Sequence, residues 1–329
     1  MLLRRRTPAI ALAAAGVVIA FSAAACGSSS SGGSPGTGSS TASSLPSYCG
    51  GQQGSGKVLV GSAQFAENET LAHIYVDVLK ACGYDASTRS FASREAYYPL
   101  VKKGKIQAVP EYAATLTDFI NFAANGSDAP SKASGDIDTT IANLKGELPA
   151  SLTVLNPADA TDRNAFAIKT SLAQANNITT LSELAAYSKT HPLTLAGPPE
   201  CPTRPFCEPG LKQTYGMTIG KFRQTDADGP LTRKALTSGK ADVGLVFSSD
   251  GDLTSLGLTV LTDDKNLQAS DNVVPLVAKS LATGAAASAL NAVSAKLDQE
   301  TLQKLNAAVV VDKGTPEQVA EQFVSQELS

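Results

Sequence analysis

The sequence has little of what enzymes and nucleic-acid-binding proteins use. It contains no tryptophan, two histidines and 5% aromatic residues, with a net charge of −3 over 329 residues. Acid–base and nucleophilic catalysis rely most often on histidine, and nucleic-acid binding relies on a basic surface. His73 lies in an expected amphipathic helix and His191 in an expected loop. We therefore expect no catalytic residue and no nucleic-acid partner, and an enzyme is the second choice.

The sequence also lacks the patterns of metal and phosphate sites. Its glycines do not form a phosphate-binding loop, and its cysteines and histidines lack the spacings of a zinc site. We expect no metal and no cofactor. No stretch after the leader is long and apolar enough to span a bilayer.

The N-terminus resembles the leader of a bacterial lipoprotein. Arginines at 4–6 precede an apolar stretch at 9–20, which is too short for a comfortable membrane span, and small residues lead into Cys26. We expect residues 1–25 to be a signal peptide and Cys26 to carry the lipid anchor. Ala23 stands where the lipoprotein motif usually has leucine. Ordinary cleavage without acylation of Cys26 is the alternative.

A segment rich in glycine, serine and threonine follows Cys26. Such a composition cannot bury enough apolar surface to fold. We expect residues 26–56 to be a flexible tether that holds the remaining chain off a membrane surface.

Four further cysteines remain out of a total of five. An even number in an exported protein indicates two disulfides, for which four cysteines allow three pairings. We favour Cys201–Cys207, which would close a proline-rich loop, and Cys49–Cys82, which would attach the end of the tether to a helix end. Zinc binding is the less favoured alternative.

Strand and helix patterns alternate along the rest of the chain. A buried strand at 57–62 precedes a helix with acidic residues in its first turn, and strands follow near 86–90 and 106–111. The same alternation starts again at 164–169 and continues to a strand at 241–247. This rhythm indicates parallel α/β sheets. Three helices are expected in the last third, at 285–297, 301–308 and 316–327.

The two series predict two α/β lobes. We expect residues 57–157 and 257–329 to form lobe I and residues 158–256 to form lobe II, with two crossings, near 156–162 and near 248–256. Two crossings imply a hinged cleft, where ligands usually bind.

Several short motifs occur together from the first strand onward. They are Val-Gly-Ser-Ala-Gln-Phe-Ala-Glu-Asn-Glu at 60–69, Pro-Glu-Tyr-Ala-Ala-Thr at 110–115, Arg-Pro at 204–205 with Tyr-Gly at 215–216, Asp-Val at 242–243 running to Asp250, and Asp-Asp-Lys at 263–265. In this order they resemble the glycine betaine/choline/carnitine-binding proteins of ABC importers. The resemblance implies a type II periplasmic-binding-protein fold whose lobes close around the ligand.

The resemblance also implies site residues. In that family, aromatic faces hold a trimethylammonium group by cation–π attraction and an arginine holds a carboxylate. Tyr98 stands at a cage position, Arg204 at the carboxylate position, and Phe247 replaces a cage tyrosine. Phe65 and Tyr112 lie in the matching motifs and are also expected to bind the ligand.

Other cage positions depart from the family pattern. One falls on Ala165, next to Phe166, and another on Asp271 or nearby. Asp271 would attract a cation, or it is a solvated loop acid. Tyr97 is the alternative to Tyr98 if the register is shifted by one residue. Each lost aromatic face removes roughly 0.5–2 kcal/mol of cation–π energy.

These observations favour an extracytoplasmic solute-binding lipoprotein of an ABC importer, anchored to the cell membrane. Its cargo would be a quaternary amine of the glycine betaine, choline or carnitine type, and its partners would be a permease and an ATPase. The alternatives are the same transport role with another small molecule, a cell-surface enzyme, and a solute sensor.

Overall fold

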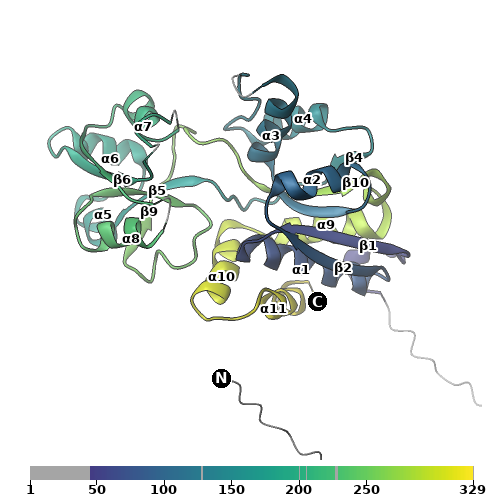
Figure 1. Ribbon diagram of the computed structural model, residues 1–329. Helices are drawn as coiled ribbons and strands as arrows, with labels where there is room; N and C mark the ends of the chain where they lie inside the picture. Colours follow the sequence, from purple (N-terminus) through teal and green to yellow (C-terminus); the bar gives the residue numbers. More distant parts are fainter. Residues whose placement is uncertain (1–44, 127–128, 200, 205, 227–228, 329) are drawn as a thin grey trace, which may run out of the picture. The chain divides into compact units, whose positions relative to one another are not determined.

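The computed structural model describes residues 45–126, 129–199, 201–204, 206–226 and 229–328 (Figure 1). The expected signal peptide, Cys26 and most of the expected tether lie outside these residues. No helix in the described ranges is long and apolar enough to cross a membrane. Within the same ranges, no three His, Cys, Asp or Glu side chains are grouped to hold a metal ion.

The described chain begins with a short 3₁₀ helix, η1 (Ser47–Cys49). Cys49 is fully buried and forms a disulfide with Cys82, at the end of helix α1 (Ala66–Ala81). The tether expected to reach residue 56 is therefore attached to the fold from Cys49 onward. The end of the tether at residue 56 was set from composition, which does not show that Cys49 is bonded to Cys82, 33 residues further along the chain.

The first sheet has five strands in the order β2-β1-β3-β10-β4. β1 pairs in parallel with β2 and β3, whereas β10 is antiparallel to β3 and β4. The strands are β1 (Lys57–Ala63), β2 (Asp85–Phe91), β3 (Ala108–Tyr112), β4 (Leu152–Val154) and β10 (Val273–Ala278). We call this sheet and its helices lobe I.

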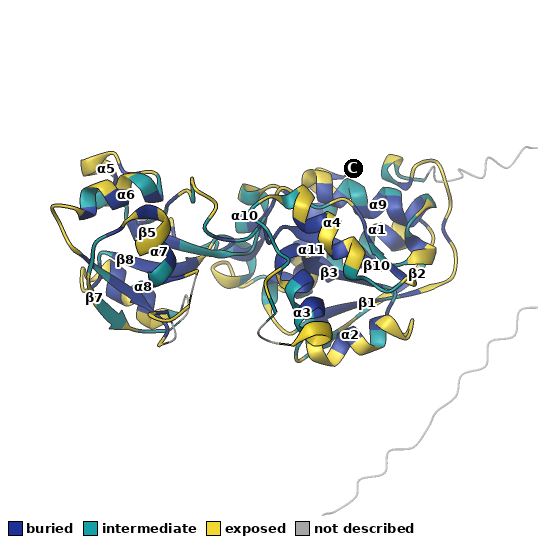
Figure 2. Ribbon diagram, turned by 90° about the horizontal axis from the view of Figure 1, so that it is seen from above, coloured by how far each residue is buried: buried dark blue, intermediate teal, exposed yellow. Residues whose placement is uncertain are grey.

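Helices cover both faces of this sheet. One core contains side chains of α1, α9 (Gly284–Lys296), α10 (Gln299–Val310) and α11 (Pro316–Glu327), and the opposite core contains those of α2 (Arg94–Lys102), α3 (Ala113–Asn125) and α4 (Ile137–Glu147). The alternation of side chains along a strand places Val58 and Val60 in the first core and Leu59 against the second. Figure 2 shows these inner surfaces as buried and the outer helix faces as exposed.

The second sheet also has five strands, in the order β7-β6-β8-β5-β9. They are β5 (Asn164–Lys169), β6 (Leu193–Gly197), β7 (Ile219–Gln224), β8 (Val243–Phe247) and β9 (Leu258–Val260). Side chains of α5 (Thr170–Asn176), α6 (Leu181–Ser188) and α7 (Glu208–Tyr215) form the core on one face, and those of α8 (Pro230–Thr237) pack on the other. We call this sheet and its helices lobe II.

Two extended segments connect the two sheets, and these segments lie side by side. Thr161 pairs with Asn272 in an antiparallel bridge, and Asp162 N–H donates to the carbonyl of Asp271 at 3.1 Å. The first crossing lies where we expected it. The second does not, because β9 pairs antiparallel with β5 and thus belongs to lobe II. The expected boundary at residue 257 is therefore wrong, and the return crossing follows β9.

The segment 248–256 instead contacts helix α10 of lobe I. Gln299 and Gln303 each donate from Nε2 to the carbonyl of Ser248 at 2.8 Å, and Asn306 donates to the carbonyl of Ser249 at 2.7 Å. A β-carbon at Gly251 would lie 2.3 Å from the backbone oxygen of Gln303, so glycine is required for this close approach.

Candidate ligand-binding cleft

A cleft of about 710 Å³ is lined by both lobes. Lobe I contributes side chains from the ends of β1 and β3 and from α2 and α3, lobe II contributes the ends of β5 and β8 and the Cys201–Cys207 loop, and the crossing segments contribute Asp162 and Asp271. This is the place predicted by two crossings. A second hollow of about 650 Å³, beside η1 and α11, is lined largely by polar and acidic side chains, and Tyr48 is its one aromatic residue.

Three exposed phenylalanines meet in this cleft. Phe65, Phe206 and Phe247 are 42%, 48% and 37% exposed, and all three line it. In the described part of the chain, they are the only aromatic side chains among the large hydrophobic residues that are exposed. Exposing a phenylalanine to water is unfavourable, and gathering three of them in one concave site is typical of a surface that a ligand covers.

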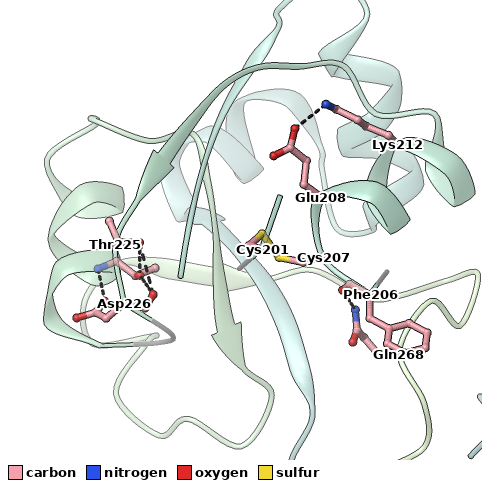
Figure 3. The surroundings of a disulfide bond; sticks show 9 residues. Cys201, Phe206, Cys207, Glu208, Lys212, Thr225, Asp226 and Gln268 are labelled. Carbon is pink, nitrogen blue, oxygen red and sulfur yellow. Dashed lines mark hydrogen bonds and ion pairs between the residues drawn. A yellow bond between two sulfur atoms is a disulfide. The ribbon is translucent and has the colours of Figure 1, made fainter. Parts of the chain in front are cut away.

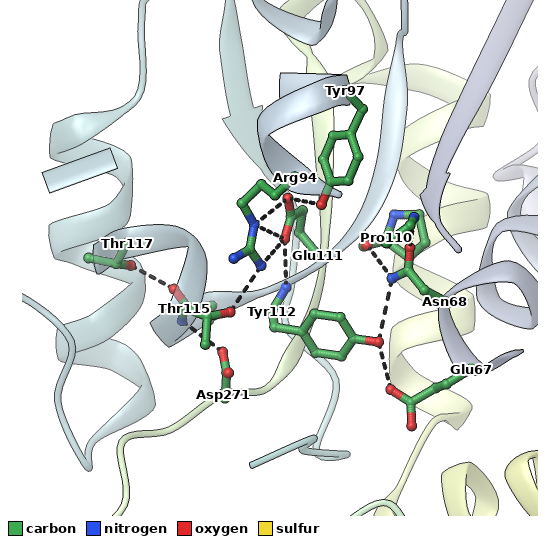
Figure 4. A network of polar contacts seen from close by, with 12 residues as sticks. Glu67, Asn68, Arg94, Tyr97, Pro110, Glu111, Tyr112, Thr115, Thr117 and Asp271 are labelled. Atoms are coloured by element: carbon green, nitrogen blue, oxygen red, sulfur yellow. Dashed lines mark hydrogen bonds and ion pairs between the residues drawn. The ribbon is translucent and has the colours of Figure 1, made fainter. Parts of the chain in front are cut away.

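Tyr112 lies at the end of β3 and also lines the cleft. Figure 4 shows its hydroxyl directed toward Glu67 and Asn68. Its ring stacks against Phe65 with 6.2 Å between centroids. Its hydroxyl donates to Oε1 of Glu67 at 2.6 Å and accepts from Nδ2 of Asn68 at 3.4 Å. Nδ2 of Asn306 donates to the other oxygen of Glu67. These bonds hold the Tyr112 ring in one orientation.

Glu111 organises the neighbouring wall. It is fully buried, and its carboxylate accepts from Arg94 Nη2 at 2.7 Å, from Arg94 Nε at 3.1 Å and from the Tyr97 hydroxyl at 2.6 Å (Figure 4). Arg94 also donates to the hydroxyl of Thr115. Charge-assisted, bidentate bonds of this kind have well-defined geometry. Arg94 and Tyr97, which both line the cleft, are thereby fixed in place.

Tyr97, and not Tyr98, faces the cleft. Tyr98 packs edge-on against Phe119 at 5.4 Å between centroids, and the Lys102 ammonium lies 5.3 Å from the centre of its ring. Tyr98 is absent from the cleft lining, whereas Tyr97 is part of it. Successive residues of a helix point about 100° apart, so a shift of one residue exchanges the two tyrosines.

Asp162 and Asp271 line the cleft, and Glu67 lies behind the Tyr112 ring. Asp271 is buried, which excludes a solvated loop acid, and its Oδ1 accepts from the backbone N–H of Thr115 at 3.0 Å. Burial raises the pKa of Asp271 to about 7. Burial and the nearby Asp162 carboxyl raise the pKa of Glu67 to about 7, and burial also raises the pKa of Asp162.

Two arginines on the lobe II side have no acidic partner among the described residues. Arg204 is exposed and lies in the loop closed by the Cys201–Cys207 disulfide, and Arg163 follows Asp162. Both line the cleft. The same disulfide loop carries Phe206, whose carbonyl accepts from Gln268 Nε2 at 2.7 Å (Figure 3). The loop therefore presents a cation and an aromatic face together.

The structure brings most of the expected site residues together. Phe65, Tyr112, Arg204, Phe247 and Asp271 all line the cleft. Phe166 lies in the lobe II core, and Ala165 packs against the core beside α8. Sequence reasoning did not find Arg94, Asp162, Arg163 and Phe206, all of which line the cleft. Two signals were available: Phe206 is two residues from Arg204, and Asp162 lies at the end of the expected first crossing.

Two α/β sheets joined by two crossing segments around an aromatic and charged cleft define a bilobed binding protein. The family described as the substrate-binding domain of ABC-type glycine betaine transport systems matches residues 56–326. The chain belongs to this family.

Known relatives agree with this assignment. The chain is 26% identical over 284 residues to the glycine betaine-binding protein YehZ of Escherichia coli, covering 83% of this chain and 92% of YehZ. It is also 26% identical over 278 residues to a glycine-betaine-binding protein of Pseudomonas aeruginosa, covering 80% of this chain and 86% of that one.

Solved structures show the same fold. The ligand-free structure of YehZ superposes with a TM-score of 0.72 at 24% identity, covering 82% of this chain and 98% of that one. A glycine betaine/carnitine/choline ABC transporter structure gives a TM-score of 0.71 at 19% identity, with the same coverage.

Proposed function

We propose that the cleft binds a small quaternary amine of the glycine betaine, choline or carnitine type, and that the protein delivers it to the permease and ATPase of an ABC importer. The observation that carries this proposal is the convergence of three exposed phenylalanines, buried acids and two arginines that form no salt bridge with a described residue, all in one cleft. The relatives are named for the same ligand class. No step of this role requires catalysis.

The cleft is suited to a ligand with a cationic head. A trimethylammonium group donates no conventional hydrogen bond, so aromatic faces and nearby carboxylates are its natural partners. Phe65 and Tyr112 supply faces from lobe I, and Phe206 and Phe247 supply faces from lobe II. Each face contributes about 0.5–2 kcal/mol, and the lobes supply the complete set only together.

The anionic end of a zwitterion would contact lobe II. Arg204 and Arg163 line the cleft and have no acidic partner among the residues that the structure describes. A guanidinium binds a carboxylate with two parallel hydrogen bonds. The disulfide restricts the loop that carries Arg204, so little conformational freedom is lost on binding. Choline lacks the carboxylate and would use the aromatic and acidic side only.

Calorimetric titration of the purified chain tests this proposal. The panel holds glycine betaine, choline, carnitine, proline betaine, amino acids and sugars. Phe206→Ala should weaken binding of a quaternary amine by about 2- to 30-fold, and Arg204→Met should weaken glycine betaine more than choline. Leu231→Ala and Lys221→Met alter exposed residues of lobe II outside the cleft and should leave affinity unchanged.

The panel also separates the alternatives. Binding of an amino acid or sugar without any quaternary amine would keep the transport role and replace the cargo. Binding of no quaternary amine would refute the proposed ligand class.

We further propose that the protein is held at the outer side of the cell membrane by a lipid on Cys26. The leader pattern at 1–25 and the Gly/Ser-rich segment after it support this anchor. Cys26→Ser should move the protein from the membrane fraction to the soluble fraction. Unchanged membrane association of this variant would refute acylation as the anchor.

A further inference from the structure

We propose that Asp162 and Asp271, with Glu67 behind Tyr112, determine specificity for a cationic ligand, and that binding of the cation releases a proton from these carboxyl groups. This inference rests on the proposed function. The three groups come from three separate segments: helix α1 and the two crossings. Asp162 and Asp271 line the cleft directly.

The geometry places the acids where the lobes meet. The backbone N–H of Asp162 donates to the carbonyl of Asp271, so the two residues lie beside each other on the paired crossing segments. Glu67 accepts from the Tyr112 hydroxyl, and this links it to an aromatic face of the cleft. A cation held in this part of the cleft lies beside Asp162 and Asp271, with Glu67 behind the Tyr112 ring.

Among the described residues, no salt bridge joins Glu67 or Asp162 to a cationic side chain. Glu67 accepts from Tyr112 of β3 and from Asn306 of α10, and it lies near the Asp162 carboxyl. Asp162 accepts from the Ser249 hydroxyl at 2.8 Å and faces Asp250.

The nearby arginines either form salt bridges with other acids or line the cleft without a salt bridge to a described residue. Arg233 forms salt bridges with Asp250 and Asp252. Arg94 attracts Asp271 but is paired with Glu111. Arg163 borders Asp162 along the chain and lines the same cleft.

These surroundings keep the carboxyl groups partly protonated near neutral pH when no cation is bound. Burial raises the pKa of Glu67 and of Asp271 to about 7, and burial raises that of Asp162 as well. A quaternary ammonium ion favours the ionised carboxylates and so lowers these pKa values when it binds. The ionised form is the one that binds, so affinity rises with pH through about 7 and falls as pH drops below it.

The linkage has a measurable size. A carboxyl whose pKa matches the ambient pH is about half protonated, so two such groups release between about 0.5 and 1 proton per bound cation at neutral pH. Well below that pH, affinity should fall by up to about tenfold per pH unit for each linked proton.

The experiment uses choline, which has no group that titrates near neutral pH, and its carbon isostere, in which a tert-butyl group replaces trimethylammonium. Titrating the full chain in two buffers of different ionisation enthalpy gives the number of protons released. We expect proton release and a pH-dependent affinity for choline, and neither for the isostere.

Variants identify the source of the proton. Asp162→Asn and Asp271→Asn should each reduce the pH dependence and the preference for choline over the isostere. Asp159→Asn removes an exposed acid from the same crossing, outside the cleft lining, and should change neither. Glu67→Gln should reduce proton release while the circular dichroism of the folded chain is retained.

The outcomes distinguish the two proposals. Choline binding with a flat pH profile and equal enthalpies in both buffers would overturn the proton linkage and leave the proposed ligand class intact. Equal pH dependence for choline and the isostere would also overturn it. Failure of every quaternary amine to bind across the pH range would overturn both proposals.

Discussion

Replacing Glu111 by glutamine tests whether the Arg94–Glu111 pair holds the wall of the cleft. Glu111 is fully buried, and the side chain of Arg94 is 20% exposed. The substitution keeps the size of the side chain but leaves the guanidinium without its counter-charge. Breaking a fully buried pair costs about 3–5 kcal/mol. Because Arg94 retains contact with water, we expect a loss of about 2–3 kcal/mol in the free energy of unfolding.

Urea unfolding at neutral pH, followed by circular dichroism, measures this loss, since the chain has no tryptophan for fluorescence. Glu300→Gln is the matched control, because the Lys304–Glu300 pair is 72% and 75% exposed. It should cost much less than Glu111→Gln, because water and salt screen an exposed pair. Arg94→Met combined with Glu111→Gln removes the unpaired charge and should lose less than Glu111→Gln alone.

One result would contradict the reasoning directly. If Glu111→Gln and Glu300→Gln destabilise the protein equally, the buried pair does not contribute through its charge. The midpoint alone should move, because a change in the denaturant slope would indicate a change in the unfolding transition itself.

Further predictions concern covalent links and glycines. Replacing Cys49 and Cys82 by alanine opens a loop with a sequence separation of 33 and should lower the free energy of unfolding by about 3.5–4 kcal/mol. Replacing Cys201 and Cys207, with a separation of 6, should lower it by about 2 kcal/mol. Equal losses in thermal unfolding would contradict the loop-length argument. Gly251→Ala should destabilise the contact with α10, whereas Gly146→Ala, with open space around it inside α4, should stabilise by about 0.5–1 kcal/mol. Similar melting temperatures for the two glycine variants would refute this contrast.

Local patterns in the sequence predicted much of lobe I. The apolar run of β1, the acids at the start of α1 and the strand before Tyr112 were recognisable because burial and helix capping act over a few residues. The pattern did not reveal α5 or β7, which are short and mostly exposed or half-buried. It also did not reveal the partner of β9, because three residues carry no information about which sheet they join.

Some residues of the cleft were predicted from the sequence, and others were recognised only in the structure. Arg204 and Phe247 were found because they stand in recognisable motifs, and both line the cleft. Arg94, Asp162 and Arg163 stand in no such motif, and they belong to the site because distant segments meet there. Tyr97 and Tyr98 are adjacent in sequence and both are buried in lobe I, so only the tertiary structure shows that Tyr97, and not Tyr98, lines the cleft.

The sequence by itself predicted the α/β alternation, favoured the two disulfide pairs that the structure contains, and carried the motifs of the family, because these depend on composition, spacing and short motifs. Only the tertiary structure decided where the second crossing lies, which tyrosine faces the cleft, and that Asp162 and Asp271 line it together with aromatic side chains of both lobes. The physical reason is that burial and charge environment are properties of contacts between remote segments, and no single segment of the chain contains them.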